Sequence, residues 1–169
     1  MHLFILSLVT LFTFGVSAQQ KTTFFPGENL KDFSYYCGGV HTFLPHYKYS
    51  KSISWLLIPK GSVGQRHFIS NRNAIDYSLS ASANLDIQHA EAEASYLFYP
   101  MPAYGFYLGV GLNINEIYYF DVPAKSFFYW TEYHGIAGLQ FKLNDETPVF
   151  VQVKYTKNGI LSVLYGVSF

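Results

Sequence analysis

Charged side chains are scarce in this chain, so those that fall within apolar stretches are candidates for chemistry. Lys, Arg, Asp and Glu make up 13% of the 169 residues, about half the usual share for a soluble domain. Seven polar residues are expected on one shared inward face: Arg66, Asp76, Glu91, Glu93, Glu132, Gln140 and Lys154. Such a set could form a polar conduit, a gate of ion pairs, or a closed interior in which acids and bases neutralise one another. The closed interior is favoured, because an unpaired buried charge is very costly.

Glu91 and Glu93 are the pair of acids that most needs a counter-charge. They stand two positions apart, so in a strand both side chains point to the same side. At least one of them requires a basic partner, and Arg66 is the expected one.

A second candidate chemistry is acyl transfer or hydrolysis, which a histidine supports when a serine and an acid lie beside it. Glu132 and His134 alternate onto one face, and Ser126 precedes them. No His-x-Ser arrangement occurs in this part of the sequence, so a structural role for His134 is favoured. Further histidines at 41, 46, 67 and 89 lack metal-ligand spacing. The sequence therefore predicts no catalytic residue, no metal site and no cofactor.

The elements that carry these residues are predicted to be strands. Apolar and polar or small residues alternate with a period of two, which is the period of a strand. The stretch 88–99 contains good helix formers and could be a helix, but its alternating acids favour a strand. Strands are expected at about 34–44, 61–69, 75–84, 88–99, 104–115, 127–141, 149–155 and 159–169.

The connections between these strands are predicted to differ in length. Residues 45–60 and 116–126 read as long loops, with a strand extension within 53–58, and the other connections read as short turns. Lys157-Asn158-Gly159 is the strongest hairpin signal. Eight strands is an even number, which places both ends of a membrane barrel on the periplasmic side.

Alternation alone does not decide whether the apolar faces point inward or outward. Two features favour an outer wall that faces lipid. The non-apolar faces of the third, fifth and eighth strands carry small residues, which suit the narrow interior of an eight-stranded barrel. Aromatic residues make up 20% of the chain and flank the apolar faces, as an interfacial girdle would. A secreted, soluble, lipocalin-like binder is the alternative.

The N-terminus is predicted to be a secretory signal peptide. Residues 3–16 are nearly all apolar and are followed by Val16-Ser17-Ala18, which has small residues where cleavage requires them. The predicted organisation is a signal peptide at 1–18, a periplasmic lead-in at 19–33 and a β-barrel at 34–169.

The C-terminus carries the most specific pattern in the chain. Tyr165, Val167 and Phe169 are apolar at every second position up to the last residue. This resembles the C-terminal signature of bacterial outer-membrane β-barrels, and the chain as a whole resembles their small eight-stranded class, which includes the membrane domain of OmpA, OmpX and OmpW. The resemblance implies an antiparallel up-and-down barrel in the outer membrane, inserted by the barrel assembly machinery, which would read these three residues.

The function expected from this resemblance is a structural or surface-interaction role without catalysis. The alternatives are a narrow channel for small or hydrophobic solutes and an enzyme that modifies lipid A. Expected partners are outer-membrane lipid or lipopolysaccharide, the assembly machinery, and extracellular or envelope proteins, whereas a formal net charge of zero gives no reason to expect nucleic acid. Aromatic residues that could serve as surface-loop contacts are Tyr47, Tyr49, Trp55, Tyr118, Tyr119 and Phe120.

Overall fold

The computed structural model describes residues 31–44, 57–84, 87–119, 127–143 and 147–169. The predicted signal peptide, most of the predicted lead-in and residues 53–56 of the predicted strand extension at 53–58 lie outside these residues. Among the described residues, no helix is long and apolar enough to cross a membrane.

Eight antiparallel strands form a closed barrel in chain order, which confirms the predicted fold class. The region 88–99, where a helix was the alternative, is a strand. The strands are β1 Phe33–Phe43, β2 Ile58–Ser70, β3 Asn73–Ala83, β4 Ile87–Met101, β5 Phe106–Tyr119, β6 Phe127–Leu143, β7 Thr147–Thr156 and β8 Ile160–Ser168.

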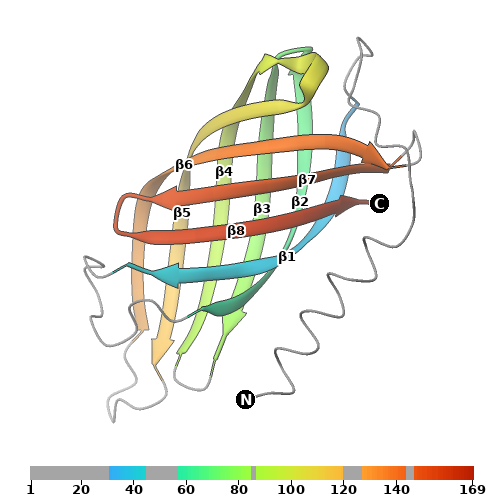
Figure 1. Ribbon diagram of the computed structural model, residues 1–169. Helices are drawn as coiled ribbons and strands as arrows, with labels where there is room; N and C mark the ends of the chain where they lie inside the picture. The colour runs from blue at the N-terminus through green and yellow to red at the C-terminus, as the bar shows by residue number, and fades with distance from the viewer. Residues whose placement is uncertain (1–30, 45–56, 85–86, 120–126, 144–146) are drawn as a thin grey trace.

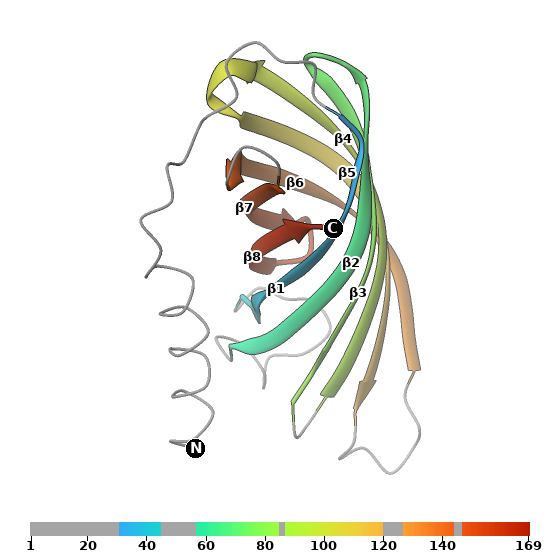
Figure 2. The ribbon, with the colours of Figure 1, turned by 90° about the vertical axis from the view of Figure 1, so that its right-hand side faces the viewer.

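The barrel closes because β1 pairs with both β2 and β8. In Figure 1 the strands β7, β8 and β1 cross steeply over β2 to β5, and Figure 2 shows these two groups as opposite walls. Crossing of opposite walls is expected, since strands in a closed barrel tilt strongly against its axis. We call the end at which β1 begins and β8 ends the terminal end, and the opposite end the loop end.

The strand alternation directs apolar side chains outward and polar ones inward. On β3, Leu79 is 63% exposed, whereas its polar neighbours Ser78 and Ser80 are buried. On β5, Val110 is 65% exposed, whereas Asn113 is buried. A soluble barrel would have the reverse arrangement, with its apolar faces packed inside. The soluble-binder alternative is therefore wrong.

Two boundaries differ from the predicted ones by three residues or more. β2 begins at Ile58 rather than near residue 61, and β5 continues to Tyr119 through residues that were expected to form a loop. The turn after β4 is a short 3-10 helix, η1 (Pro102–Tyr104), followed by Gly105 at φ 65. This left-handed conformation is open to glycine without strain, and it ends the turn one residue before β5 begins.

The start of β1 is tied to β2 by Asp32, which was expected to belong to the lead-in. The backbone N–H of Phe68 donates to Asp32 Oδ1 at 2.7 Å, and His67 Nδ1 contacts the other carboxylate oxygen. The hydrogen bond from Phe68 lowers the pKa of the Asp32 carboxyl. This tether is therefore present above the ordinary pKa of an aspartate and is lost as the pH falls through the lowered pKa.

Candidate functional site: the charged lumen

The lumen is filled by side chains at successive levels between its two ends. At the terminal end lies an apolar group, which we call the basal cluster, made of Phe33, Tyr35, Cys37, Ala74, Leu97, Tyr99, Tyr107, Ile136, Phe150 and Leu164. At the loop end lies the mouth cluster, made of Phe43, Ile58, Ile87, Ile117, Trp130 and Ile160. Polar and charged residues occupy the space between them and part of the basal level.

Arg66 is the basic residue of the basal level and is fully buried. It donates to Asp76 Oδ2 at 2.8 Å and to Gln140 Oε1 at 2.8 Å. The guanidinium carbon also lies 4.6 Å from the ring centroid of Tyr107 and 4.5 Å from that of Phe150. A planar guanidinium suits this site, because it makes several hydrogen bonds while stacking on aromatic rings.

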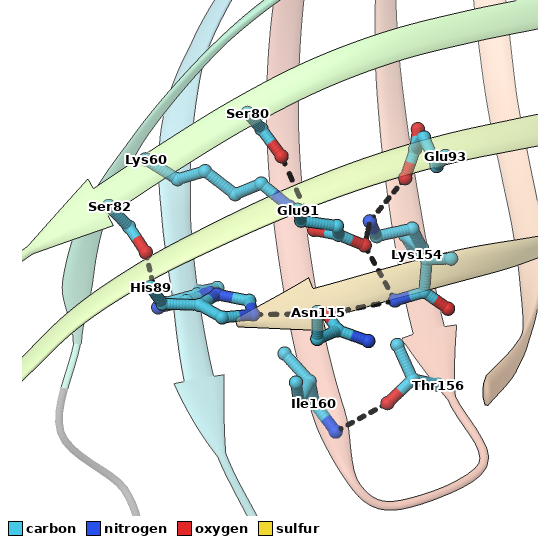
Figure 3. A network of polar contacts seen from close by, with 12 residues as sticks. Lys60, Ser80, Ser82, His89, Glu91, Glu93, Asn115, Lys154, Thr156 and Ile160 are labelled. Atoms are coloured by element: carbon cyan, nitrogen blue, oxygen red, sulfur yellow. Dashed lines mark hydrogen bonds and ion pairs between the residues drawn. The ribbon is translucent and has the colours of Figure 1, made fainter. Parts of the chain in front are cut away.

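The middle level is an ion network of Lys60, Glu91, Glu93 and Lys154 (Figure 3). Glu91 accepts from both lysines through different oxygens, and Lys154 also contacts Glu93 at 2.5 Å. Two lysines face two glutamates, and all four side chains are at most 5% exposed. The network joins β2, β4 and β7, so charge neutralisation and cross-lumen contact come from the same residues.

The expected partnership between Arg66 and the pair Glu91 and Glu93 is wrong. Arg66 forms an ion pair with Asp76 instead, and the glutamates form ion pairs with Lys60 and Lys154. Lys60 was missed because the first loop was expected to extend through it. Its position six residues before Arg66 on the same period-two face could have revealed it.

A histidine layer separates the ion network from the mouth cluster. His41 and His89 stack with ring centroids 5.2 Å apart, and His89 stacks on Trp130 at 6.0 Å. His41 Nε2 hydrogen-bonds with Ser82 Oγ at 3.1 Å, and His89 Nε2 hydrogen-bonds with Asn115 Oδ1 at 3.0 Å. Aromatic faces therefore span the lumen at this level.

His134 has a serine partner that the sequence pattern did not reveal. Ser95 Oγ lies 2.7 Å from His134 Nε2, and Asn113 Oδ1 lies 3.3 Å from His134 Nδ1. The two strands β4 and β6 flank β5, where Gly111 lies between Ser95 and His134 and leaves room for their contact. The arrangement resembles a hydrolytic triad in its atoms, but Ser95, Asn113 and His134 are each buried inside the barrel.

Glu132 is buried beside the mouth cluster and holds a turn. Its Oε1 accepts from Trp130 Nε1 and Asn115 Nδ2, both at 3.1 Å. Its Oε2 accepts from the backbone N–H of Asn158 at 3.1 Å, in the turn between β7 and β8. All seven residues expected on an inward face thus point into the lumen. Arg66, Asp76 and Gln140 form one contact group, and Glu132 is linked to the ion network through Asn115 and Asn113.

The residues expected to form the insertion signal lie on the outer wall, and two of the expected surface contacts fall within β5. Tyr165 and Phe169 are 40% and 68% exposed at the terminal end, and Val167 is half-buried beside them. Tyr118 lies near the loop end of β5, and Tyr119 is the last residue of that strand. The remaining expected surface contacts, Tyr47, Tyr49, Trp55 and Phe120, lie outside the described residues.

A shallow hollow of about 930 Å³ lies over the wall of β2 to β5 near the loop end. Small outward residues, including Gly61, Ala81 and Ala90, form part of its floor, and Glu116 and Tyr118 lie at its edge. Large side chains cover much of the remaining wall. The hollow is therefore a place where only small side chains cover the sheet.

Comparison with known proteins shows the fold. No protein-family model and no curated protein sequence matches the chain. The crystal structure of Neisserial surface protein A matches with a TM-score of 0.65 and 14% identity, covering 83% of this chain and 97% of that one. The N-terminal β-barrel domain of Pseudomonas aeruginosa OprF matches with a TM-score of 0.57 and 15% identity, covering 84% and 98%. The chain therefore has the fold of the small eight-stranded outer-membrane β-barrels, and its apolar outer wall is the surface that such a barrel turns to lipid in the outer membrane.

Proposed function

We propose that the protein is a non-enzymatic barrel of the outer membrane whose lumen is a structural core and whose interactions occur on its outside. The observation that supports this most is the filling of the lumen at the basal cluster, the ion network, the histidine layer and the mouth cluster. Each charged level is internally neutralised or hydrogen-bonded. A solute would have to displace all four levels in turn.

We do not propose that the protein modifies lipids, although Ser95, His134 and Asn113 are in contact as they would be in a hydrolytic site. Lipid substrates lie outside the barrel, whereas Ser95 and His134 are 3% and 4% exposed and face the lumen. A nucleophile must come within contact distance of the substrate carbon, and the wall of the barrel separates the two. The histidine is better explained as part of the polar core.

The proposed partners follow from the outer wall and the loop end. Outer-membrane lipid, including lipopolysaccharide, would cover the apolar wall and enter the hollow over Ala81 and Ala90. The barrel assembly machinery would read Tyr165, Val167 and Phe169 during insertion. With the terminal end in the periplasm, the loop end faces the cell exterior, and the aromatic residues of the long connections would contact extracellular or envelope proteins.

Conductance measurement distinguishes this proposal from a narrow channel. The purified barrel is reconstituted in planar bilayers, and insertion is verified by the shift of its band on detergent gels when the sample is boiled. We expect no stepwise current beyond that of a protein-free bilayer. Steps in the wild type whose ion selectivity changes in Lys154→Gln would overturn the proposal, because the current would then pass the ion network.

A further inference from the structure

We propose that the consecutive residues Tyr35 and Tyr36 form a two-sided aromatic clasp that holds the seam between β1 and β8 closed. Neighbouring residues of a strand point to opposite faces, so this pair reaches both sides of the wall. Tyr35 is 1% exposed inside the lumen, whereas Tyr36 is 61% exposed on the outside. The clasp concerns closure of the barrel and is independent of what the barrel binds.

Within the described part of the chain, the seam is the ladder that joins the first strand to the last. Its nine residue pairs run from Tyr35↔Ser168 to Phe43↔Ile160, whereas the other ladders join strands that follow one another in the sequence. Forming this ladder brings together the two ends of a loop that contains all the other strands, and the chain loses conformational entropy when that loop closes. Until it closes, β1 and β8 are open edges, whose unpaired backbone groups are very unfavourable in lipid. Extra contacts at the seam therefore act where closure is most costly.

The outer half of the clasp joins Tyr36 to the last residue of the chain. The rings of Tyr36 and Phe169 stack with centroids 4.3 Å apart and an interplanar angle of 20°. The backbone N–H of Phe169 also donates to the carbonyl oxygen of Ser34 at 3.1 Å, beyond the end of the β8 ladder. Tyr36 pairs with Val167 in the ladder, so Phe169 is its diagonal neighbour on the same face.

The inner half of the clasp joins Tyr35 to β7 across β8. The Tyr35 ring meets the Phe150 ring edge-on, with centroids 4.9 Å apart and planes at 86°. The Phe150 ring lies directly against Gly166 of β8, where any added Cβ would collide with it. The Tyr35 hydroxyl donates to Asp76 Oδ1 at 2.9 Å, which fixes the ring in place. Strand β8 is thus held between an aromatic contact inside the wall and one outside it.

The clasp gives Phe169 two successive environments. Before the seam closes, Tyr36 of β1 and Phe169 after β8 are not held together by the ladder. In the closed barrel one face is covered by Tyr36. Formation of the clasp therefore covers one face of the Phe169 ring.

A double-mutant cycle in a system without assembly factors tests the clasp. The full chain is unfolded in urea and refolded into phospholipid vesicles, and the folded fraction is read on unboiled gels for the wild type, Tyr36→Ala, Phe169→Ala and the double variant. We expect the two residues to be coupled by about twofold to tenfold in the folded-to-unfolded ratio, the range for an aromatic pair. Tyr77→Ala is the matched control, because Tyr77 is an outward tyrosine of β3, 50% exposed and away from the seam.

Two further results test the proposal. Tyr36→Phe retains the ring and is expected to keep the coupling, and Tyr36→Leu replaces Tyr36→Ala in the cycle if the alanine variant does not fold. Tyr35→Leu and Phe150→Leu are expected to be coupled in the same way across the inner side. Independent effects of Tyr36 and Phe169, or a coupling as large between Tyr77 and Phe169, would overturn the clasp.

Deletion of Phe169 in cells separates the clasp from the proposed insertion signal. We expect less assembled barrel with unchanged export. If the deletion variant assembles normally but Tyr36 and Phe169 are coupled in vesicles, Phe169 is not an insertion signal and the clasp is supported. If assembly is impaired but the two residues are not coupled in vesicles, the insertion signal is supported and the clasp is overturned.

Discussion

Glu91 accepts from Lys60 and Lys154, which come from opposite sides of the lumen, and also from Asn113 Nδ2 at 2.7 Å. A buried carboxylate is tolerated here because each of its oxygens meets donors from other strands. The Arg66 level follows the same rule, with Asp76, Gln140 and two aromatic rings around one guanidinium. At the residue scale, the charges of the lumen are therefore cross-links between strands.

Glu91→Gln is expected to lower the free energy of unfolding by about 3–5 kcal/mol, because two buried lysines would then share the single carboxylate of Glu93. Urea unfolding in detergent micelles, followed by the mobility of the unboiled protein, measures this loss. Glu116→Gln is the control, since Glu116 accepts from Tyr129 at 3.0 Å on the outer wall and should change stability by no more than about 0.5 kcal/mol. A loss for Glu91→Gln as small as that of the control would contradict the role of the network.

At the scale of elements, each strand must fit large inward side chains into a narrow lumen. Several inward-facing glycines lie against an aromatic ring of the adjacent strand, which gives that ring the space it needs. A Cβ at Gly138 of β6 would meet the Tyr107 ring of β5 and lie 2.8 Å from the carbonyl oxygen of Val151. The glycines on inward faces, which were expected to suit a small interior, therefore make room for particular rings.

Gly138→Ala is expected to destabilise the barrel by about 1–3 kcal/mol, the usual cost of overpacking. Gly135→Ala on the same strand is the matched control, because it faces outward and its added Cβ would meet no atom within 4 Å. It should be neutral or slightly stabilising, as glycine is unfavourable within a strand. Both variants are compared in the same urea titration. Equal losses would show that backbone preference, and not the Tyr107 ring, determines the effect.

At the scale of the whole molecule, the barrel separates an apolar exterior from a charged interior. Tyr36, Tyr77, Tyr96 and Phe98 are outward aromatics towards the terminal end, and Tyr129, Tyr133 and Tyr155 lie towards the loop end. Outward aliphatic residues such as Val110 and Leu112 lie between the two groups. An apolar band between two groups of aromatic residues is the outer surface expected of a barrel that spans a lipid bilayer.

Val110→Arg is expected to cost about 2–4 kcal/mol in phospholipid vesicles, because the charge would lie near the middle of the hydrocarbon layer. Ile69→Arg, at the terminal end of β2, should cost only about 0–1 kcal/mol. The two native side chains are similarly exposed, at 65% and 58%, so depth in the membrane is the main difference between them. Refolding into vesicles at a series of urea concentrations gives both values. Equal costs would contradict the proposed position of the wall in the bilayer.

The sequence by itself determined the strand content, the eight-stranded barrel class and the side of the wall on which most residues lie. These properties depend on a local period of two, which can be read in residues such as Asp76, Glu91 and Glu93 without knowing their neighbours in space. The short-range pattern also favoured a structural role for His134, but it did not reveal the partner Ser95.

Only the tertiary structure decided which inward residues meet. Lys60 and Lys154 reach Glu91 across the lumen, and Arg66 reaches Asp76, because barrel tilt and register bring particular levels of distant strands together. The stacking of Tyr36 on Phe169 likewise requires the register of β1 against β8. A period of two assigns a residue to a face, whereas a contact across a closed sheet depends on the stagger of every ladder between the two residues, which local alternation does not encode.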